Sequence, residues 1–254
     1  MSYLILTDAN SNAYNFPDNF WLQDGGVNTN QNIVNSFYAA GGRNIADGFL
    51  QASNITISGI LHGDTIAAYE TKKRALMQAL LKGGQLSRSA DSVSRYIDVK
   101  HADIQWSSFG GDGDVQLQEV TIIFRTEFPF WVDAAETTST NIVAGDDSFT
   151  VTTTGTDFII NPTIEIDADQ SADVPGVKIT NKSDGGASFN YDDPFFVQGD
   201  IVTINTGTGD ITRNGSQTSE WFSGVFIRLQ PGANTIEYEG AACTIRVKYR
   251  KVYL

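Results

Sequence analysis

Short runs of alternating apolar and polar residues, separated by turn residues, fill the last quarter of the chain and constrain its fold most strongly. Between Asp200 and Leu254 the runs are IVTIN, VFIRL, TIEY and TIRVKYRKVYL, at residues 201–205, 225–229, 235–238 and 244–254. A period of two gives each run one face for a core and one for solvent. Asn214-Gly215 suits a two-residue type I′ hairpin, because both positions need a positive φ, and Pro231-Gly232 sets a second reversal. These signals predict a β-meander.

A change in composition near the middle of the chain predicts a domain boundary. The aromatic cluster FPFW (residues 128–131) is followed by the small, polar stretch VDAAETTSTNIVAGDD (132–147), which is typical of a linker or the start of a domain. A length of 254 residues suits one large β domain or two ordinary ones. We predict two β-rich domains, residues 1–133 and 134–254. Strands at roughly 8–12-residue spacing in the second domain indicate a β-sandwich.

One segment of the first domain has the periodicity of a helix, which we place at about residues 64–82. Asp64 is the expected N-cap, and Gly83-Gly84 can end the helix in the left-handed conformation. An apolar stripe at three- and four-residue spacing is expected to pack on a sheet. Its members are Ile66, Tyr69, Leu76, Met77 and Leu80.

Strands are expected on both sides of this helix, in NITISGILHG (54–63), RYIDVKHADIQW (95–106) and VQLQEVTIIFRTEF (115–128). In the last run, Leu117 is out of phase with Val120 and Ile122, which predicts a β-bulge near Gln118-Glu119. Earlier in the chain, strands are expected around residues 3–7 and 33–39, joined by long Asn- and Gly-rich loops.

The residues that carry enzyme chemistry are sparse. The chain has two histidines, His62 and His101, and a single cysteine, Cys243, which we expect to be a small buried apolar side chain. A zinc site from these residue types is improbable, and no phosphate-binding loop, dinucleotide fingerprint or serine-hydrolase motif is present. The carboxylates of DADQSAD (167–173) lack the Gly and Glu of a calcium loop. Glycosidase carboxylates pair in space, so the sequence selects no pair. We predict no catalysis, no cofactor and no metal site.

The formal net charge of −13 disfavours nucleic-acid binding, which depends on Lys and Arg. Residues 1–133 hold 9 basic and 14 acidic residues and the remainder holds 8 and 16, so neither half is a basic module. The basic residues concentrate only in Arg246, Lys248, Arg250 and Lys251. They are interpreted as a solvated face or as guards of a strand edge. The alternative is a subunit contact against an acidic neighbour.

Aromatic residues of the second domain allow two interpretations. Their alternation favours a core, whereas exposure on one face would give a sugar-stacking platform. The residues concerned are Tyr191, Phe195, Phe196, Trp221 and Phe222. The start of the chain has no signal-peptide pattern and no run is long enough for a membrane span, which predicts a soluble protein made in a cytoplasm.

Four features in this order resemble the distal tail protein family of long-tailed, siphovirus-like bacteriophages. They are the helix after a strand, the run ending in FPFW, the meander GD-x-V-T-I-N…G-x-I…NG, and the closing LQPGANTIEYEG…IRVKYRKVYL. The resemblance covers nearly the whole chain. It implies an N-terminal split-barrel-like domain that forms a hexameric ring and a C-terminal galectin-like β-sandwich. The Asn- and Gly-rich segment NSNAYNFPDNFWLQDGGVNTNQN (10–32) departs from the family's short N-terminal strands.

The same resemblance implies a structural virion protein at the tail tip, assembled in the host cytoplasm. Its ring would join the tail tube to the baseplate and let DNA pass through its lumen. The outer domain would carry fibres or receptor-binding proteins. The implied partners are further copies of the chain, the tail tube protein, and the tail hub or tape-measure protein. The alternatives are a carbohydrate-binding module or adhesin, and another tail-tube or tube-terminator ring.

Overall fold

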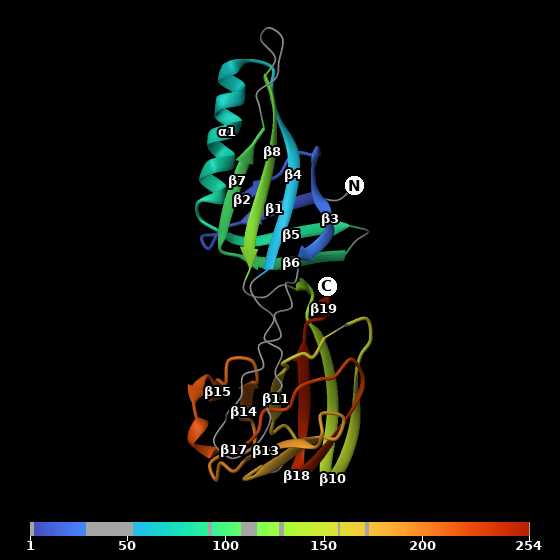
Figure 1. The fold of residues 1–254 in the computed structure, drawn as a ribbon. Coiled ribbons are helices and arrows are strands. Elements are labelled where there is room, and N and C mark those ends of the chain that lie inside the picture. Colours follow the sequence, from blue (N-terminus) through green and yellow to red (C-terminus); the bar gives the residue numbers. More distant parts are fainter. Residues whose placement is uncertain are drawn as a thin grey trace, which may run out of the picture. The chain divides into compact units, whose positions relative to one another are not determined.

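A computed structural model divides the chain into two compact units, residues up to Val132 and Asp133–Tyr253. It describes residues 3–28, 53–90, 93–107, 116–126, 130–156, 158–170 and 173–253. Both units are mainly β, and one α-helix is present in the part of the chain that the structure describes (Figure 1). The predicted fold class, mainly β with one helix, is therefore confirmed.

The described strands of the first unit form two antiparallel sheets. One has the order β9-β6-β5-β1-β2, and the other has the order β3-β4-β8-β7. The predicted strand at residues 3–7 is confirmed as β1, whereas the one expected at 33–39 lies outside the described residues. The strands are β1 (Tyr3–Thr7), β2 (Ala13–Asn15), β3 (Phe20–Asn28), β4 (Ser53–Gly63), β5 (Gly84–Ala90), β6 (Val93–Val99), β7 (His101–Trp106), β8 (Gln116–Thr126) and β9 (Trp131–Asp133).

The helix α1 (Ile66–Leu80) begins one residue later than expected, and its N-cap is Thr65. The Thr65 hydroxyl accepts a hydrogen bond from the Ala68 amide at 3.1 Å, whereas the Asp64 carboxylate lies 3.3 Å from His62 Nε2. Asp64 as the cap was therefore wrong, because its side chain faces back along the chain. Gly83, with φ of +62°, adopts the predicted left-handed conformation after the helix.

Three members of the predicted stripe, Tyr69, Leu76 and Leu80, are buried, whereas Ile66 is 61% exposed. Figure 1 shows α1 running beside β7, β8 and β4. The close approach of the helix to β4 depends on Gly63, since a Cβ there would lie 2.5 Å from the Tyr69 amide nitrogen. Glycine at this position therefore lets the first turn of α1 contact the strand directly.

Strand β8 contains no bulge. It pairs with β4 in one unbroken register from Ser53↔Thr126 to Gly63↔Gln116, so the bulge expected near Gln118 was wrong. The change of phase has another cause. Gln118 faces inward with Val120 and Ile122, where its side chain accepts a hydrogen bond from the Tyr69 hydroxyl, and Leu117 faces outward at 42% exposure. A polar residue at an inward position therefore gave the sequence the same alternation pattern as a β-bulge.

A long two-stranded ribbon organises the second unit. β10 (Thr137–Thr153) pairs with β18 (Gly232–Tyr249) along its whole length, with a register shift between Val143 and Gly145. The other edge of β18 pairs first with β12 and then with β11. β18 thereby joins the strand series β11-β14-β15-β16 to the series β12-β13-β17. These strands are β11 (Thr163–Asp167), β12 (Val177–Asn181), β13 (Ala187–Tyr191), β14 (Ile201–Asn205), β15 (Ile211–Arg213), β16 (Ser216–Gln217) and β17 (Phe222–Gly224), and β19 (Val252–Tyr253) follows β18.

This topology bears on two predictions. The polar stretch at residues 132–147, expected to be a linker or the start of a domain, is the start of the second unit, since that unit begins at Asp133 and β10 at Thr137. Its β-branched threonines suit an extended strand better than their polarity suggests. The meander holds only for β14, β15 and β16. Residues 225–229 form no strand beyond a single bridge at Leu229, and β18 runs through the middle of the sheet.

The type I′ hairpin is confirmed between β15 and β16, where Asn214 and Gly215 have φ of +49° and +81°. Cys243 is fully buried, as predicted, and lies 3.3 Å from the Tyr238 hydroxyl. Burial raises the pKa of the Cys243 thiol to about 11. The thiol therefore stays protonated at neutral pH and serves as an apolar packing group.

Candidate assembly surfaces

The basic residues predicted as a subunit contact lie at the end of β18, where they bind groups of their own unit. Arg246 Nη1 lies 2.8 Å from Asp167 Oδ2, and Lys248 Nζ contacts Glu165. Both carboxylates are on the neighbouring strand β11. The hydrogen bond to Asp167 raises the pKa of Arg246. Since β18 has β10 on one side and β11 on the other here, the interpretation as edge guards was wrong.

The last two basic residues lie just after β18. Arg250 Nη1 donates to the backbone carbonyls of Asp133, at 3.3 Å, and Ala134. The Lys251 carbonyl accepts a hydrogen bond from the Asp133 amide at 3.0 Å. Among the described residues Lys251 has no ion pair. Of these four cations, its ammonium group is therefore the one that remains available for contact with another molecule. A subunit contact by the four residues stays a prediction.

The predicted aromatic group divides between core and surface. Tyr191 and Phe196 are fully buried, which fits the core interpretation. Phe195 is 63% exposed, and Trp221 and Phe222 are half-buried. The group therefore contains a surface component around Phe195 and Trp221, whose rings meet edge to face at a centroid distance of 6.3 Å.

A buried polar cluster, which we call the Asp193 cluster, lies behind these aromatics and consists of Tyr191, Asp193, Arg213 and Thr218. Asp193 is fully buried, and its Oδ2 lies 2.6 Å from Arg213 Nη1 and 3.0 Å from the Tyr191 hydroxyl. The same hydroxyl lies 2.9 Å from Thr218 Oγ1. Burial is the main cause that raises the pKa of Tyr191 to about 12. Sequence patterns do not reveal this cluster, and the only local signal is the turn that Asp193-Pro194 indicates.

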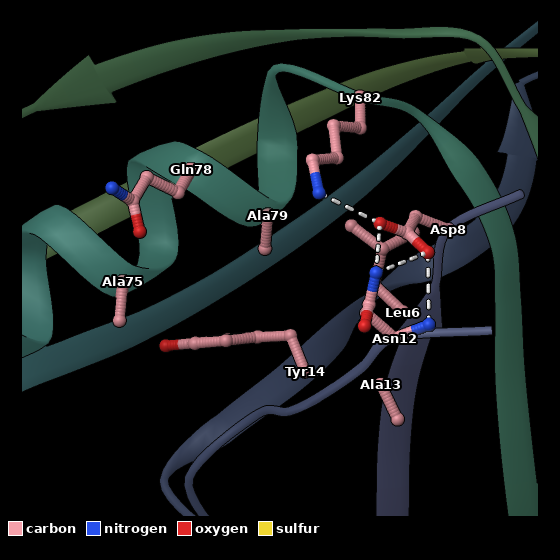
Figure 2. Close-up of a pocket in the computed structure, with 9 residues that line it drawn as sticks. All are labelled: Leu6, Asp8, Asn12, Ala13, Tyr14, Ala75, Gln78, Ala79 and Lys82. Atoms are coloured by element: carbon pink, nitrogen blue, oxygen red, sulfur yellow. Dashed lines mark hydrogen bonds and ion pairs between the residues drawn. The ribbon is translucent and has the colours of Figure 1, made fainter. Parts of the chain in front are cut away.

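In the first unit, a pocket of about 190 Å³ lies between the β1–β2 hairpin and α1 (Figure 2). Asp8 stands at its rim and accepts hydrogen bonds from the Asn10 and Asn12 amides and from the Asn12 side chain, and Lys82 Nζ lies 2.9 Å from it. These bonds, first the one from the Asn12 side chain, hold the pKa of Asp8 well below its ordinary value. The ion pair fastens the hairpin to the end of the helix. Leu6, Tyr14 and Ala75 give the rest of the pocket an apolar lining, as the sticks in Figure 2 show.

The carboxylates of Asp167, Asp169 and Asp173 do not gather as ligands for a cation. Asp167 binds Arg246, and Asp169 Oδ2 accepts a hydrogen bond from the Thr244 hydroxyl at 2.8 Å. Within the ranges that the structure describes, no group of three or more His, Cys, Asp or Glu side chains is placed to hold a metal ion. In those same ranges no helix is long and apolar enough to cross a membrane.

Comparison with known proteins identifies the class of the second unit. Residues 154–253 match the family model of the siphovirus-type tail component, C-terminal domain. No curated protein matches the sequence. Among solved structures, the Dit (gp 19.1) protein of phage SPP1, described as a paradigm of the hub adsorption apparatus in phages that infect Gram-positive bacteria, aligns over 100% of both chains. Its TM-score is 0.66 at 17% identity.

Two baseplate structures, of phage P2 with Ca and of phage p2 with Sr, cover 98% and 97% of this chain, at TM-scores of 0.41 and identities of 11% and 12%. The second unit is thus similar to the C-terminal domain of siphovirus-type tail components, over residues 154–253. That match supports the resemblance to the distal tail protein family for residues 154–253, and the likeness to the SPP1 Dit structure shows that the fold is shared along the whole chain.

Proposed function

We propose that this protein is the hub that joins the tail tube to the baseplate or tail tip, assembled as a hexameric ring. In this proposal residues 1–133 form the ring and its lumen, and residues 134–254 form a galectin-like domain on the outside. The outer domain attaches fibres or receptor-binding proteins. The observation that carries the proposal is the full-length likeness to the SPP1 hub protein, together with the tail-component match in the second unit.

The charge of the chain supports passage of DNA without retention. The first domain has a net charge of −5 by the count of 9 basic and 14 acidic residues. A lumen lined by it repels phosphate within a Debye length of about 8–10 Å at physiological salt. In the second unit, Arg246 and Lys248 are neutralised by Asp167 and Glu165, so these cations are poor phosphate ligands.

The partners in this proposal are the tail tube protein, the tail hub or tape-measure protein, and fibre or receptor-binding proteins. Assembly takes place in the host cytoplasm. The protein has no catalytic role, no cofactor and no specific site for nucleic acid or membrane. Lys251, with the neighbouring Arg246, Lys248 and Arg250, is proposed as a contact to an acidic surface of the next subunit.

The closest competing function is a tail-tube or tube-terminator ring. Such proteins are generally built from one domain, and the division into two compact units favours the hub instead.

Labelling of virions distinguishes these functions. Gold-conjugated antibodies raised against this chain should bind at the distal end of the tail in electron micrographs. Label along the whole tube would make the chain a tube protein, and label at the head-proximal end would make it a terminator. Virions without label, in a preparation in which antibodies to the tube protein bind, would overturn the proposal.

A further inference from the structure

An exposed aromatic ring in the second unit is held by a fixed turn. Phe195 is 63% exposed, whereas the next residue, Phe196, is fully buried. The turn is closed by a hydrogen bond from the Phe196 amide to the Asp193 carbonyl at 3.1 Å and by another from the Phe195 amide to Asp193 Oδ1 at 2.9 Å. Asp193 is itself fully buried and paired with Arg213. The backbone that carries Phe195 is thus fixed, so less conformational entropy is lost when the ring binds a ligand.

A second aromatic residue, Trp221, is held by the same polar cluster. It ends a short 3-10 helix, Ser219–Trp221, whose preceding residue Thr218 is buried and hydrogen bonded to the Tyr191 hydroxyl. Tyr191 also binds Asp193, which holds the turn of Phe195. One buried cluster therefore fixes both aromatic segments, and the two rings meet edge to face at 70°.

Two further residues lie next to these aromatics, Asp192 just after β13 and Gly176 just before β12. The Asp192 amide donates to the Trp221 carbonyl at 2.9 Å, one step beyond the paired residues Tyr191 and Phe222. Directly opposed residues of antiparallel strands share a face, so Asp192 lies beside Trp221. On its other side is Gly176, where an added Cβ would lie 3.1 Å from Asp192 Oδ1. The exposed Asp192 carboxylate has no ion pair among the described residues, and the glycine leaves it uncovered.

We propose that Phe195, Trp221, Asp192 and Gly176 form a binding site for a neutral saccharide. A pyranose ring has an apolar C–H face that stacks on an aromatic side chain, and its hydroxyls donate hydrogen bonds to a carboxylate. This surface offers the aromatic rings of Phe195 and Trp221 beside the carboxylate of Asp192. Nearby Glu220, also exposed, adds a second negative charge, which disfavours anionic ligands such as nucleic acid or sulfated glycans.

The size of the surface favours a saccharide over a protein. Each aromatic side chain contributes at most about 150–250 Å² of contact area. Two partly exposed rings therefore fall well below the roughly 800 Å² that each partner buries in a standard protein interface. One or two sugar rings are the ligand that this area can cover, and weak affinity in single contacts is expected. This site is separate from the ring-forming role and does not depend on it.

Ligand-observed saturation-transfer NMR with the full chain tests the site. The probes are maltotetraose, chitotetraose and a galactose tetramer, with heparin as the anionic control. At least one neutral tetramer should bind and heparin should not. Trp221→Ala, Phe195→Ala and Asp192→Ala should each weaken binding by about tenfold or more. Gly176→Val should do the same by covering Asp192, without removing any ligand-binding group.

The control is Trp21→Ala, which removes another aromatic side chain of similar exposure, 52%, in the first unit and should leave binding unchanged. Thermal melting of each variant checks that the fold is retained. Absence of binding to all three neutral tetramers would overturn the proposal, and so would binding that the Asp192 and Trp221 variants leave unchanged. Binding of a Lys- and Arg-rich peptide instead, abolished by salt, would assign the surface to a cationic protein partner.

Discussion

The two units use different kinds of polar group in their most deeply buried side-chain contacts. In the first unit, the neutral pair of Tyr69 and Gln118 ties α1 to β8 inside the core, and the ion pair of Asp8 and Lys82 lies at the rim of a pocket. In the second unit, the ion pair of Asp193 and Arg213 joins a fully buried carboxylate to a guanidinium that is 25% exposed. A buried charge that loses its partner costs more than a neutral group does.

The neutral and the ionic contact fix different parts of the two units. The neutral contact in the first unit sets the position of a helix against a sheet. The ionic contact in the second unit fixes two loops that carry exposed aromatics. A surface that binds a ligand benefits from such rigidity, because less entropy is lost on binding. The second unit should therefore be the more sensitive of the two to loss of a single polar side chain.

The largest effect is expected for Asp193→Ala. Removing the carboxylate leaves Arg213 and Tyr191 without their shared acceptor, and breaking a buried pair costs about 3–5 kcal/mol, with the lower end expected here because Arg213 is partly exposed. Urea unfolding followed by tryptophan fluorescence measures the loss. Asp210→Ala is the matched control, since Asp210 is exposed and its carboxylate, among the described residues, accepts a hydrogen bond only from the Thr208 hydroxyl. Equal stability of the two variants would show that the buried pair of Asp193 and Arg213 does not stabilise the second unit.

A smaller effect is expected for Tyr69→Phe in the first unit. The change removes the hydroxyl that donates to the buried Gln118 side chain, at a cost of about 1–2 kcal/mol. Adding Gln118→Leu should recover part of this loss, because it removes the acceptor that Tyr69→Phe leaves unpaired. Recovery is incomplete because the Ser107 carbonyl then loses its hydrogen bond from Gln118 Nε2, at 2.9 Å. The same urea titration measures both variants. A double variant less stable than the sum of its single changes would show that the hydrogen bond does not explain the position of α1.

The cap of α1 gives a third and smaller effect. Thr65→Ala should destabilise the first unit by about 1 kcal/mol, since it removes the acceptor for the Ala68 amide. Asp64→Ala is the neighbouring control and should change stability by less than about 0.5 kcal/mol. Circular dichroism during thermal melting compares them. The reverse order would restore Asp64 as the cap.

Alkaline pH gives a separate test of the second unit through Cys243. Burial raises the pKa of Cys243 from 9.0 to about 11, so the unfolded chain releases this proton first. The contribution of the protonated thiol is complete below pH 9 and is lost as the pH rises toward 11. In the native protein at pH 8, a thiol reagent should label Cys243 only at the rate of unfolding. Rapid labelling at that pH would mean that the thiol is exposed or ionised.

How much the sequence predicted depends on the distance along the chain over which a signal acts. The helix, the Asn214-Gly215 hairpin and strands such as β1 and β14 follow local periodicity or turn chemistry, and the structure contains all of them. The central position of β18 was missed because pairing with β10, about 95 residues earlier in the chain, leaves no local signal. The bulge predicted in β8 was wrong because an inward polar residue, Gln118, gives the same sequence pattern as a bulge.

The candidate site residues show the same limit. The sequence indicated that Arg246, Lys248 and Arg250 share a face, which the alternation of a strand determines. It did not reveal that Asp167 and Glu165 on β11 neutralise the first two, since those carboxylates lie about 80 residues earlier. Likewise, alternation alone could not separate the buried Phe196 from the exposed Phe195, because a turn anchored on Asp193 decides which ring faces solvent.

The symmetry of the assembled protein is the most direct test of the proposed hexameric hub. Native mass spectrometry of the purified chain, alone and mixed with the tail tube protein, combined with class averages from electron microscopy, measures the copy number and the shape. A hexameric hub should give particles of six copies with sixfold rotational symmetry and a central opening. A chain that stays monomeric under both conditions, or a ring with an arginine-lined opening, would contradict it.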